Sequence, residues 1–502
     1  MTKKDLYRQI LERYKEIVVL ENIQGLANWD MEVCMPKNGV EQRSEGLALL
    51  SGLIHDRWVA PEIGTLLTDI KQQPDYEELS TIEQRNIYLI QREYDKRTKI
   101  PKELVTTLAK QRTIATKDWK EAKAKADFSI FQPSLEKMVE LIKQRAQYLD
   151  PDKHPYDVLL DNYEPGLSMK IIDQLFNQLK EGLIPLIQKC ISAPNQPDLS
   201  LIKRKCPIDV QQKLAADVVK VINYQLDAGR IDEAAHPFTG GYYNDVRITT
   251  HYSTEDFSNG FLAVLHEGGH GLYEQNMPEN YKYQPIGSAC SSGFHEAQAR
   301  FIENVIGRSL EFWGFYLPRL KKITGNIFAD VELQPFVHAL NRVSPSPIRI
   351  AADPVTYSLH IILRYEIEKD LITDQCSIDE LPQIWNQKMK DYLDIEVKND
   401  AEGILQDTHW AWGLFGYFSN YALGNIYDGQ LLWKMEQEMP SWRKVLQKGK
   451  ISKIIDWLIT NIHKQGNRYD PLELVKEITG KELSTKYYLD YLETKYSDLY
   501  QF

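Results

Sequence analysis

The chain has 502 residues, of which 43% are hydrophobic and 26% charged, and its formal net charge is −11. These values are typical of a globular protein that buries a large core. The negative charge disfavours nucleic-acid binding, which requires clustered positive charge to neutralise phosphates. No apolar run approaches the roughly 18 residues that a bilayer crossing needs, and the N-terminus interleaves charged with apolar residues, unlike a secretory signal. We therefore expect no nucleic-acid partner and no membrane partner.

The five cysteines are odd in number, widely scattered and without a CxxC pair. This pattern is typical of free thiols in a reducing compartment and predicts a cytoplasmic protein. Length alone would allow about three domains. However, the chain has no internal repeat and no low-complexity tract, and the Pro- and Asn-containing loop at residues 192–200 is too short to mark a domain boundary.

The first third of the chain predicts successive helices, because apolar residues recur there at three- and four-residue spacing with charge between them. The pattern is clearest over residues 5–20, 79–99 and 101–127. Residues 236–252 differ, since Tyr, Val, Ile and Thr surround a Gly-Gly turn and predict one or two short strands. Helical patterns then return, with predicted N-caps at Ser253, which has Asp256 three residues on, and at Asp353 before Pro354. The expected architecture is mainly α with a small β element.

The sequence His266-Glu267-Gly268-Gly269-His270 lies in one of these predicted helices. Two histidines four residues apart lie on the same helix face, so their imidazoles can take two neighbouring positions around a metal ion. Glu267 is turned away by about 100°, which suits a general base that holds a water better than a third ligand. Two helix-interior glycines cost about 1 kcal/mol each relative to alanine. We therefore expect another backbone or a substrate to approach this helix closely.

A catalytic zinc site needs a third protein ligand and one open position. The candidates are Glu296 and His295, in a predicted helix 25 to 26 residues after His270, and Glu274, which continues the histidine stripe. Spacing alone gives Glu296 only a small preference and leaves the choice open.

The residues around this motif are similar to a known family. In order along the chain, HPF occurs at 236–238, DxRxT at 245–249, HExxH at 266–270, a counterpart of HES/GQ at 295–298, I/VRxxAD at 348–353 and GxxQDxHW at 403–410. Residues 29–36 and 416–425 also match family segments. The chain thus resembles the carboxypeptidase Taq-type metallocarboxypeptidases, the thermostable carboxypeptidase 1 family. One departure is Ala297, where the family usually has Ser or Gly.

The resemblance implies a fold and a ligand set. The expected fold is mainly α: a single large helical fold over residues 1–502 with a deep substrate groove, a small β-sheet at its edge and a gluzincin-type metal helix, its catalytic motifs concentrated in 236–425. The implied metal ligands are His266, His270 and Glu296, with Glu267 catalytic, which selects Glu296 over Glu274 by analogy. The expected cofactor is one divalent ion, Zn²⁺ with Co²⁺ or Mn²⁺ as alternatives. A homodimer is also implied.

Six further side chains are predicted to contact substrate: His236, Arg247, Arg349, His409, Tyr417 and Tyr421. Arg349 can clamp a terminal carboxylate, because a guanidinium binds both oxygens at once. The structural alternative for Arg349 is an ion pair with Asp353. For Arg247, an ion pair with Asp245 is as favoured as substrate contact.

The other candidates also have structural alternatives. His236 could donate to a peptide carbonyl or pack against Phe238. His409 could stabilise an oxyanion or only pack between aromatic neighbours. Tyr417 and Tyr421 could hydrogen-bond the tetrahedral intermediate, although most buried tyrosines bond a backbone group.

The predicted function is a metal-dependent carboxypeptidase that releases C-terminal amino acids, with broad specificity, from peptides with a free C-terminus. Glu267 would act as general base and acid. One alternative is an oligopeptidase or dipeptidyl carboxypeptidase that uses the same metal helix. A second is a non-catalytic peptide-binding protein, which would require the loss of Glu267 or of a ligand, and none is missing here.

Overall fold

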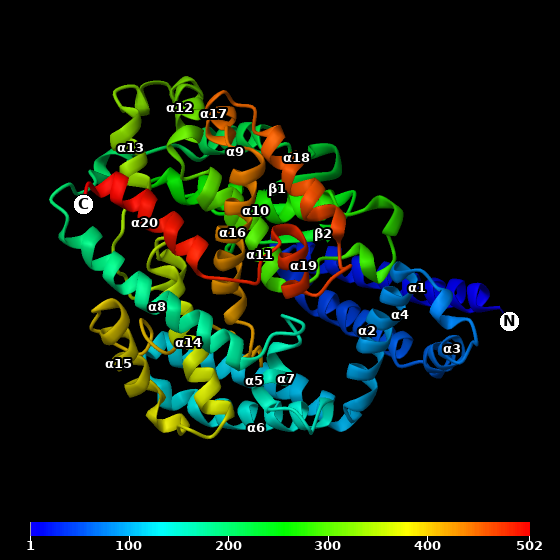
Figure 1. Ribbon diagram of the computed structural model, residues 1–502. Helices are drawn as coiled ribbons and strands as arrows, with labels where there is room; N and C mark the ends of the chain where they lie inside the picture. Colours follow the sequence, from blue (N-terminus) through cyan, green and yellow to red (C-terminus); the bar gives the residue numbers. More distant parts are fainter. Residues whose placement is uncertain (1) are drawn as a thin grey trace.

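The computed structural model describes residues 2–502 and consists mainly of helices, with one small sheet (Figure 1). The mainly α architecture with a small β element is thereby confirmed. The helices predicted over residues 5–20, 79–99 and 101–127 are found as α1, α4 and α5. The N-terminal elements are α1 (Lys3–Val33), α2 (Val40–Trp58), α3 (Pro61–Lys71), α4 (Thr81–Lys99), α5 (Lys102–Lys125), α6 (Gln132–Leu149) and α7 (Pro155–Leu160).

The central part of the chain carries the sheet and the helices around it. These elements are α8 (Met169–Ser192), α9 (Ile208–Val221), β1 (Gly229–Glu233), β2 (Thr239–Tyr242), β3 (Asp245–Thr250), α10 (Phe257–Gln275), α11 (Ser292–Arg300), α12 (Leu310–Thr324), α13 (Leu333–Leu340), α14 (Tyr357–Ile372) and α15 (Leu381–Leu393). The C-terminal helices are α16 (Ser419–Glu438), α17 (Trp442–Gln447), α18 (Ser452–Asn461), α19 (Pro471–Thr479) and α20 (Lys486–Tyr500).

The sheet has three strands in the order β1-β3-β2, one more than the sequence predicts at most. β1 pairs with β3 in parallel, and β2 pairs with β3 in antiparallel. The missed strand, β1, has the sequence GRIDE, whose charges hide it because strand signals rest on β-branched and aromatic residues. The sheet lies against α10, near the middle of the molecule (Figure 1).

Both predicted N-caps need correction. The cap of α10 is Asp256, whose carboxylate accepts from the Ser258 N–H at 2.9 Å, whereas Ser253 accepts from Glu255 in the turn before. Asp353 does accept the N–H groups of Val355 and Thr356, but these belong to an irregular turn, and α14 begins only at Tyr357. In both places an acidic side chain caps the turn nearest to it, and the sequence does not specify how many residues later regular helix begins.

The buried apolar side chains form two cores. The larger one extends from α5 to α20, and a smaller one lies among α1, α2, α3 and α4 and includes Trp58 and Ile87. The helices α10, α11 and α16 run through the middle of the larger core, and α11 packs on both α10 and α16 (Figure 1). Within residues 2–502 no helix has the length and apolar content needed to cross a bilayer.

Candidate metal centre and catalytic site

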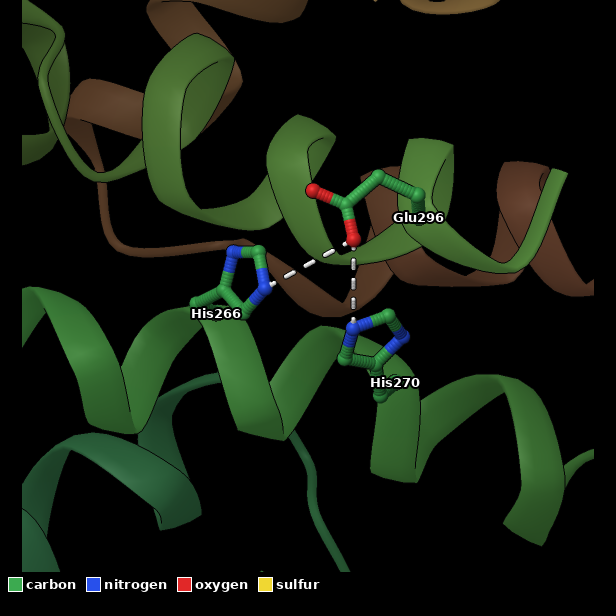
Figure 2. A group of neighbouring side chains, drawn as sticks. All are labelled: His266, His270 and Glu296. Carbon is green, nitrogen blue, oxygen red and sulfur yellow. Dashed lines mark ion pairs between the residues drawn. The ribbon is translucent and has the colours of Figure 1, made fainter. Parts of the chain in front are cut away.

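His266, His270 and Glu296 come together between α10 and α11 (Figure 2). One ligand atom from each lies within 4.8 Å of the others. The Glu296 Oε2 atom is 3.9 Å from His266 Nε2 and 3.7 Å from His270 Nε2. Two imidazoles and one carboxylate form the donor set that catalytic zinc sites use together with an open position.

The electrostatics of this cluster suit a cation. Burial by itself would lower the pKa of the His266 imidazole, but Glu296, Glu303 and Glu267 raise it to about 9. A place where three carboxylates stabilise positive charge on a neighbouring group also stabilises a metal ion. The residues present therefore fit a divalent cation, in donor chemistry and in charge.

The crossing of α10 and α11 depends on Gly269. A Cβ atom at this position would lie 2.5 Å from the Gln298 carbonyl oxygen and 2.6 Å from Ala299 Cα. The expected close backbone approach is therefore confirmed for Gly269, and it brings Glu296 over the histidines. At Gly268 the nearest atom is instead the tip of the Ile222 side chain, at 2.6 Å.

Glu267 is buried, with 6% of its surface exposed, and its carboxylate contacts Thr239 of the sheet while it also interacts electrostatically with His266 and Glu296. The Thr239 hydroxyl of β2 donates to Glu267 Oε2 at 2.7 Å and lies 3.0 Å from its backbone carbonyl. Burial raises the pKa of the Glu267 carboxyl, which His266 and Thr239 partly offset. A raised pKa moves a carboxylate toward the range in which it both accepts and returns a proton near neutral pH. The sequence analysis missed Thr239, because β2 reaches Glu267 only through the tertiary fold.

His266 is held from behind by a carboxylate that the sequence analysis did not assign. Glu303 Oε2 lies 3.0 Å from His266 Nδ1, and Arg308 contacts the other oxygen at 3.3 Å. Burial by itself would raise the pKa of Glu303, yet the hydrogen bond with His266 and the charge of Arg308 lower it to about 2. Glu303 is therefore an anion that accepts from Nδ1 and leaves Nε2 free for a metal. The seven-residue spacing from Glu296 was the only sequence signal.

The two rival third ligands are occupied with each other. His295 Nε2 lies 2.9 Å from Glu274 Oε1, and His295 Nδ1 lies 2.6 Å from His270 Nδ1. Neither belongs to the ligand group that includes Glu296. Both line a cavity of about 460 Å³ that is bounded by α4, by residues 162–165 and by residues 285–295.

Arg349 is buried and paired with Asp407, and not with Asp353 as the structural alternative supposed. Its Nε and one terminal nitrogen lie 3.1 and 2.8 Å from Asp407 Oδ1, and its other terminal nitrogen donates to the Tyr357 hydroxyl at 3.2 Å. Arg364 binds the second Asp407 oxygen at 2.7 Å. The two guanidiniums overcome the effect of burial and hold the pKa of Asp407 far below its ordinary range. Three of the five N–H groups of Arg349 are thus engaged, and two remain for a ligand.

A chain of contacts joins this cluster to the metal centre. Arg300 Nε lies 3.4 Å from Glu296 Oε1, and the Arg300 guanidinium stacks 3.9 Å from the centre of the Tyr357 ring. Tyr357 in turn accepts from Arg349. The predicted carboxylate reader and the third predicted ligand are therefore connected through two side chains that sequence reasoning missed.

Tyr417, Tyr421 and His409 gather beside the Arg349 cluster. The two tyrosine rings lie 5.4 Å apart, Arg349 stacks 5.1 Å from the Tyr421 ring, and His409 Nε2 is 3.4 Å from the Tyr421 hydroxyl. Burial lowers the pKa of His409 to about 4, so its imidazole is neutral at neutral pH. Glu296 contributes to raising the pKa of both tyrosines, which places their hydroxyls in the field of the metal centre.

The remaining two candidates lie apart from this group. Arg247 of β3 forms a two-point ion pair with Asp245, at 2.7 and 3.0 Å, and stacks 4.4 Å from the Trp29 ring. Its structural alternative is thus realised. His236 is exposed on the turn between β1 and β2.

Comparison with known proteins agrees with this geometry. The chain is 40% identical to "Carboxypeptidase 1" of Bacillus subtilis over 98% of both chains, and 38% identical to "Thermostable carboxypeptidase 1" of Thermus thermophilus over the full length of both. A solved M32 carboxypeptidase from Deinococcus radiodurans superposes with a TM-score of 0.96 at 31% identity, covering 99% of this chain and 100% of that one. Residues 9–496 match the model of one family. The chain belongs to the carboxypeptidase Taq (M32) metallopeptidase family.

Proposed function

We propose that the protein is a metal-dependent carboxypeptidase that removes amino acids one at a time, with broad specificity, from peptides with a free C-terminus. The observation that carries this proposal is the cluster of His266, His270 and Glu296 with the buried carboxyl of Glu267 directly beside it. The family membership and the carboxypeptidase names of the relatives support it.

His266, His270 and Glu296 would hold one divalent ion, for which we propose Zn²⁺, with Co²⁺ or Mn²⁺ as alternatives. A bound ion of this kind supplies Lewis acidity that polarises the scissile carbonyl and lowers the pKa of the attacking water. Measuring metal content in the purified protein by mass spectrometry tests the identity of the ion. A protein that contains no divalent metal and gains none on incubation would contradict the ligand assignment.

Glu267 takes the proton from the attacking water and returns it to the leaving amine. Its burial and its hydrogen bond with Thr239 keep the carboxyl in place for both transfers. The developing oxyanion requires hydrogen-bond donors that are in position beforehand. The hydroxyl groups of Tyr417 and Tyr421 are the proposed donors. The negative charge of Glu296 contributes to raising the pKa of both, and both therefore keep the proton that a donor needs.

Recognition of the free C-terminus is assigned to Arg349. An exopeptidase must distinguish the chain end from an internal peptide bond, and only the end offers two equivalent anionic oxygens. The two free N–H groups of Arg349 can bind such a carboxylate, while Asp407 and the Tyr421 ring fix the plane of the guanidinium. His409 is proposed to line the same subsite as a neutral imidazole. For His236 and Arg247 the geometry offers no support, and their substrate contact stays a prediction.

The decisive experiment is mass spectrometry of one peptide during digestion, with and without a chelator. We expect a ladder of single-residue losses from the C-terminus, its abolition by the chelator and its return with Zn²⁺ or Co²⁺. Circular dichroism should remain unchanged by the chelator, because a core of this size does not depend on one ion. Full activity of metal-free protein would refute metal dependence.

The same digestion separates the alternatives. Release of dipeptides would identify a dipeptidyl carboxypeptidase, and internal cuts would identify an oligopeptidase. Peptide binding without any cleavage would identify a non-catalytic binding protein. The peptidase alternatives use the same metal helix, so the masses of the products distinguish them.

We further propose that the protein is a homodimer that docks through the outer face of α1 and α2. Five large apolar side chains on this face are between 39% and 66% exposed: Val19, Ile23, Leu26, Leu49 and Leu53. The neighbouring glycines at 25, 46 and 52 have open space around them, which allows a second pair of helices to approach closely. Light scattering should give twice the chain mass, and Leu49→Asp should give the monomer. A wild-type monomer at micromolar concentration would refute the dimer.

All five cysteines are free in the part of the chain that the structure describes, which supports the proposed cytoplasmic location. Cell fractionation tests that location. We also infer that residues 1–502 act as one catalytic domain, since the family match extends from 9 to 496. Limited proteolysis that released an active fragment without α1 to α4 would contradict a single domain.

A further inference from the structure

His295 and Glu274 form a second hydrogen-bonded chain that ends on His270. The two Nδ1 atoms of His270 and His295 are 2.6 Å apart, and His295 Nε2 lies 2.9 Å from Glu274 Oε1. The centres of the two imidazole rings are 4.6 Å apart and their planes are inclined by only 27°, so the rings meet edge to edge through their Nδ1 atoms. Figure 2 shows that Glu296 faces one ring nitrogen of His270, so the contact with His295 is made by the other ring nitrogen.

We propose that His295, anchored by Glu274, is a positioning residue that fixes the ring and the tautomer of His270 for metal binding. This inference rests on the proposed function, in which His270 is a ligand. It gives a role to two side chains that compete for the ligand position in the sequence and that the proposed reaction does not use.

The proton positions follow from donor and acceptor chemistry. A metal takes the lone pair of His270 Nε2, so the proton of that ring must be on Nδ1. His270 Nδ1 then donates, and His295 Nδ1 must accept with its own lone pair. The proton of His295 is therefore on Nε2, where the Glu274 carboxylate accepts it. Each of the four ring nitrogens then has one partner of the right kind, and reversing either proton would place two donors or two lone pairs face to face.

The positions of the three residues in the helices make this arrangement compact. His270 and Glu274 are four residues apart on α10 and therefore lie on one face. His295 faces them from α11, one residue before Glu296. Because α10 and α11 cross closely, two consecutive residues of α11 reach the site. Glu296 is a proposed ligand, and His295 supports the ligand His270.

The two histidine ligands are supported differently. His266 is bonded directly by Glu303, an anion with 15% side-chain exposure that Arg308 also contacts. His270 is bonded through a second imidazole, and His295 and Glu274 border the 460 Å³ cavity with side-chain exposures of 27% and 19%. Outer partners of this kind typically change metal affinity by about 10- to 100-fold. If His295 is only truncated, water from the cavity can take its place as the acceptor for His270. An apolar side chain that fills the position excludes this water, so it should weaken metal binding more than a truncation does.

The test measures Zn²⁺ affinity by competition with a chromophoric chelator, together with the visible absorption spectrum of the Co²⁺-substituted protein. We expect His295→Leu to weaken Zn²⁺ binding by about 10- to 100-fold and to alter the Co²⁺ spectrum. His295→Gln should lie between that variant and the wild type, because its amide oxygen can still accept from His270. Glu274→Leu should act in the same direction as His295→Leu. The matched control is His55→Leu, on α2, which should bind both ions as the wild type does.

Circular dichroism and melting of the metal-free proteins show whether each variant folds. If His295→Leu fails to fold, His295→Gln and Glu274→Leu carry the test. A folded His295→Leu protein with Zn²⁺ affinity within about twofold of the wild type and an unchanged Co²⁺ spectrum would overturn the inference. Wild-type protein that binds no divalent metal ion would instead overturn the proposed function, and the two failures are therefore distinguishable.

Discussion

Replacing Arg349 by alanine tests how the protein recognises a peptide end. The substitution removes a guanidinium that has two free N–H groups and is connected to the proposed metal centre through Tyr357 and Arg300. Hydrogen bonds to a charged group contribute about 1.5 to 3 kcal/mol, which corresponds to a rise in KM of about 10- to 150-fold. Because the carboxylate is bound alike in the ground state and the transition state, kcat should change little.

The fold should survive this substitution. Asp407 keeps its ion pair with Arg364 at 2.7 Å, so no buried charge loses its last partner. Arg349→Lys should restore only part of the affinity, because an ammonium is a point charge without the planar fork of donors. Arg204→Ala is the matched control, since it also removes an arginine from a two-point ion pair, with Asp330, at another place.

The assay compares one peptide with a free C-terminus and the same peptide amidated at that end. The wild-type protein should cleave the free form and resist the amidated form, and Arg349→Ala should lose most of this discrimination. Equal cleavage of both forms by the wild type would refute carboxylate reading and favour the oligopeptidase. If the wild type discriminates and Arg349→Ala does so equally, another cation reads the carboxylate, and Arg247 is the next to test.

Three further predictions concern the same site. Glu267→Gln should lower turnover by about 10² to 10⁴ with metal content unchanged, whereas Glu296→Gln should lose the metal. Mass spectrometry measures the bound metal in both variants, and loss of the metal from Glu267→Gln would show that the role of Glu267 is misassigned. Asp407→Asn leaves two buried guanidiniums without an anion and should reduce the free energy of unfolding by about 3 to 5 kcal/mol. The folded-state pKa of Asp407 is depressed, so this stabilisation is present above its ordinary value of 3.8 and is lost as the pH falls below it. Urea unfolding at several pH values should therefore show the variant approaching the wild type in acid, and a constant difference would contradict the ion-pair assignment. Gly269→Ala forces backbone atoms of α10 and α11 apart and should destabilise the protein by about 1 to 3 kcal/mol in thermal unfolding; Gly268→Ala, which meets only a side-chain tip, should cost less.

The local pattern of the sequence predicted the features that depend on neighbours along one helix. His266 and His270 share a face because four residues make slightly more than one turn, and this holds wherever the helix lies. The helices of the first third follow from apolar spacing in the same way. The sequence also indicated a role for Gly269, because glycine inside a helix lowers helix stability and is expected only where another group approaches closely.

Features that join distant segments were decided by the tertiary structure. Spacing left Glu274 and Glu296 as rivals, and only the crossing of α10 and α11 sets Glu296 over the histidines while Glu274 bonds His295. Similarly, the partner of Arg349 is Asp407, 58 residues further along the chain, and not the nearby Asp353. A charged side chain pairs with whichever opposite charge the packed core brings within about 3 Å, because buried charges must be compensated. That choice depends on how helices pack, and the packing is a property of the whole chain that no short stretch of sequence specifies.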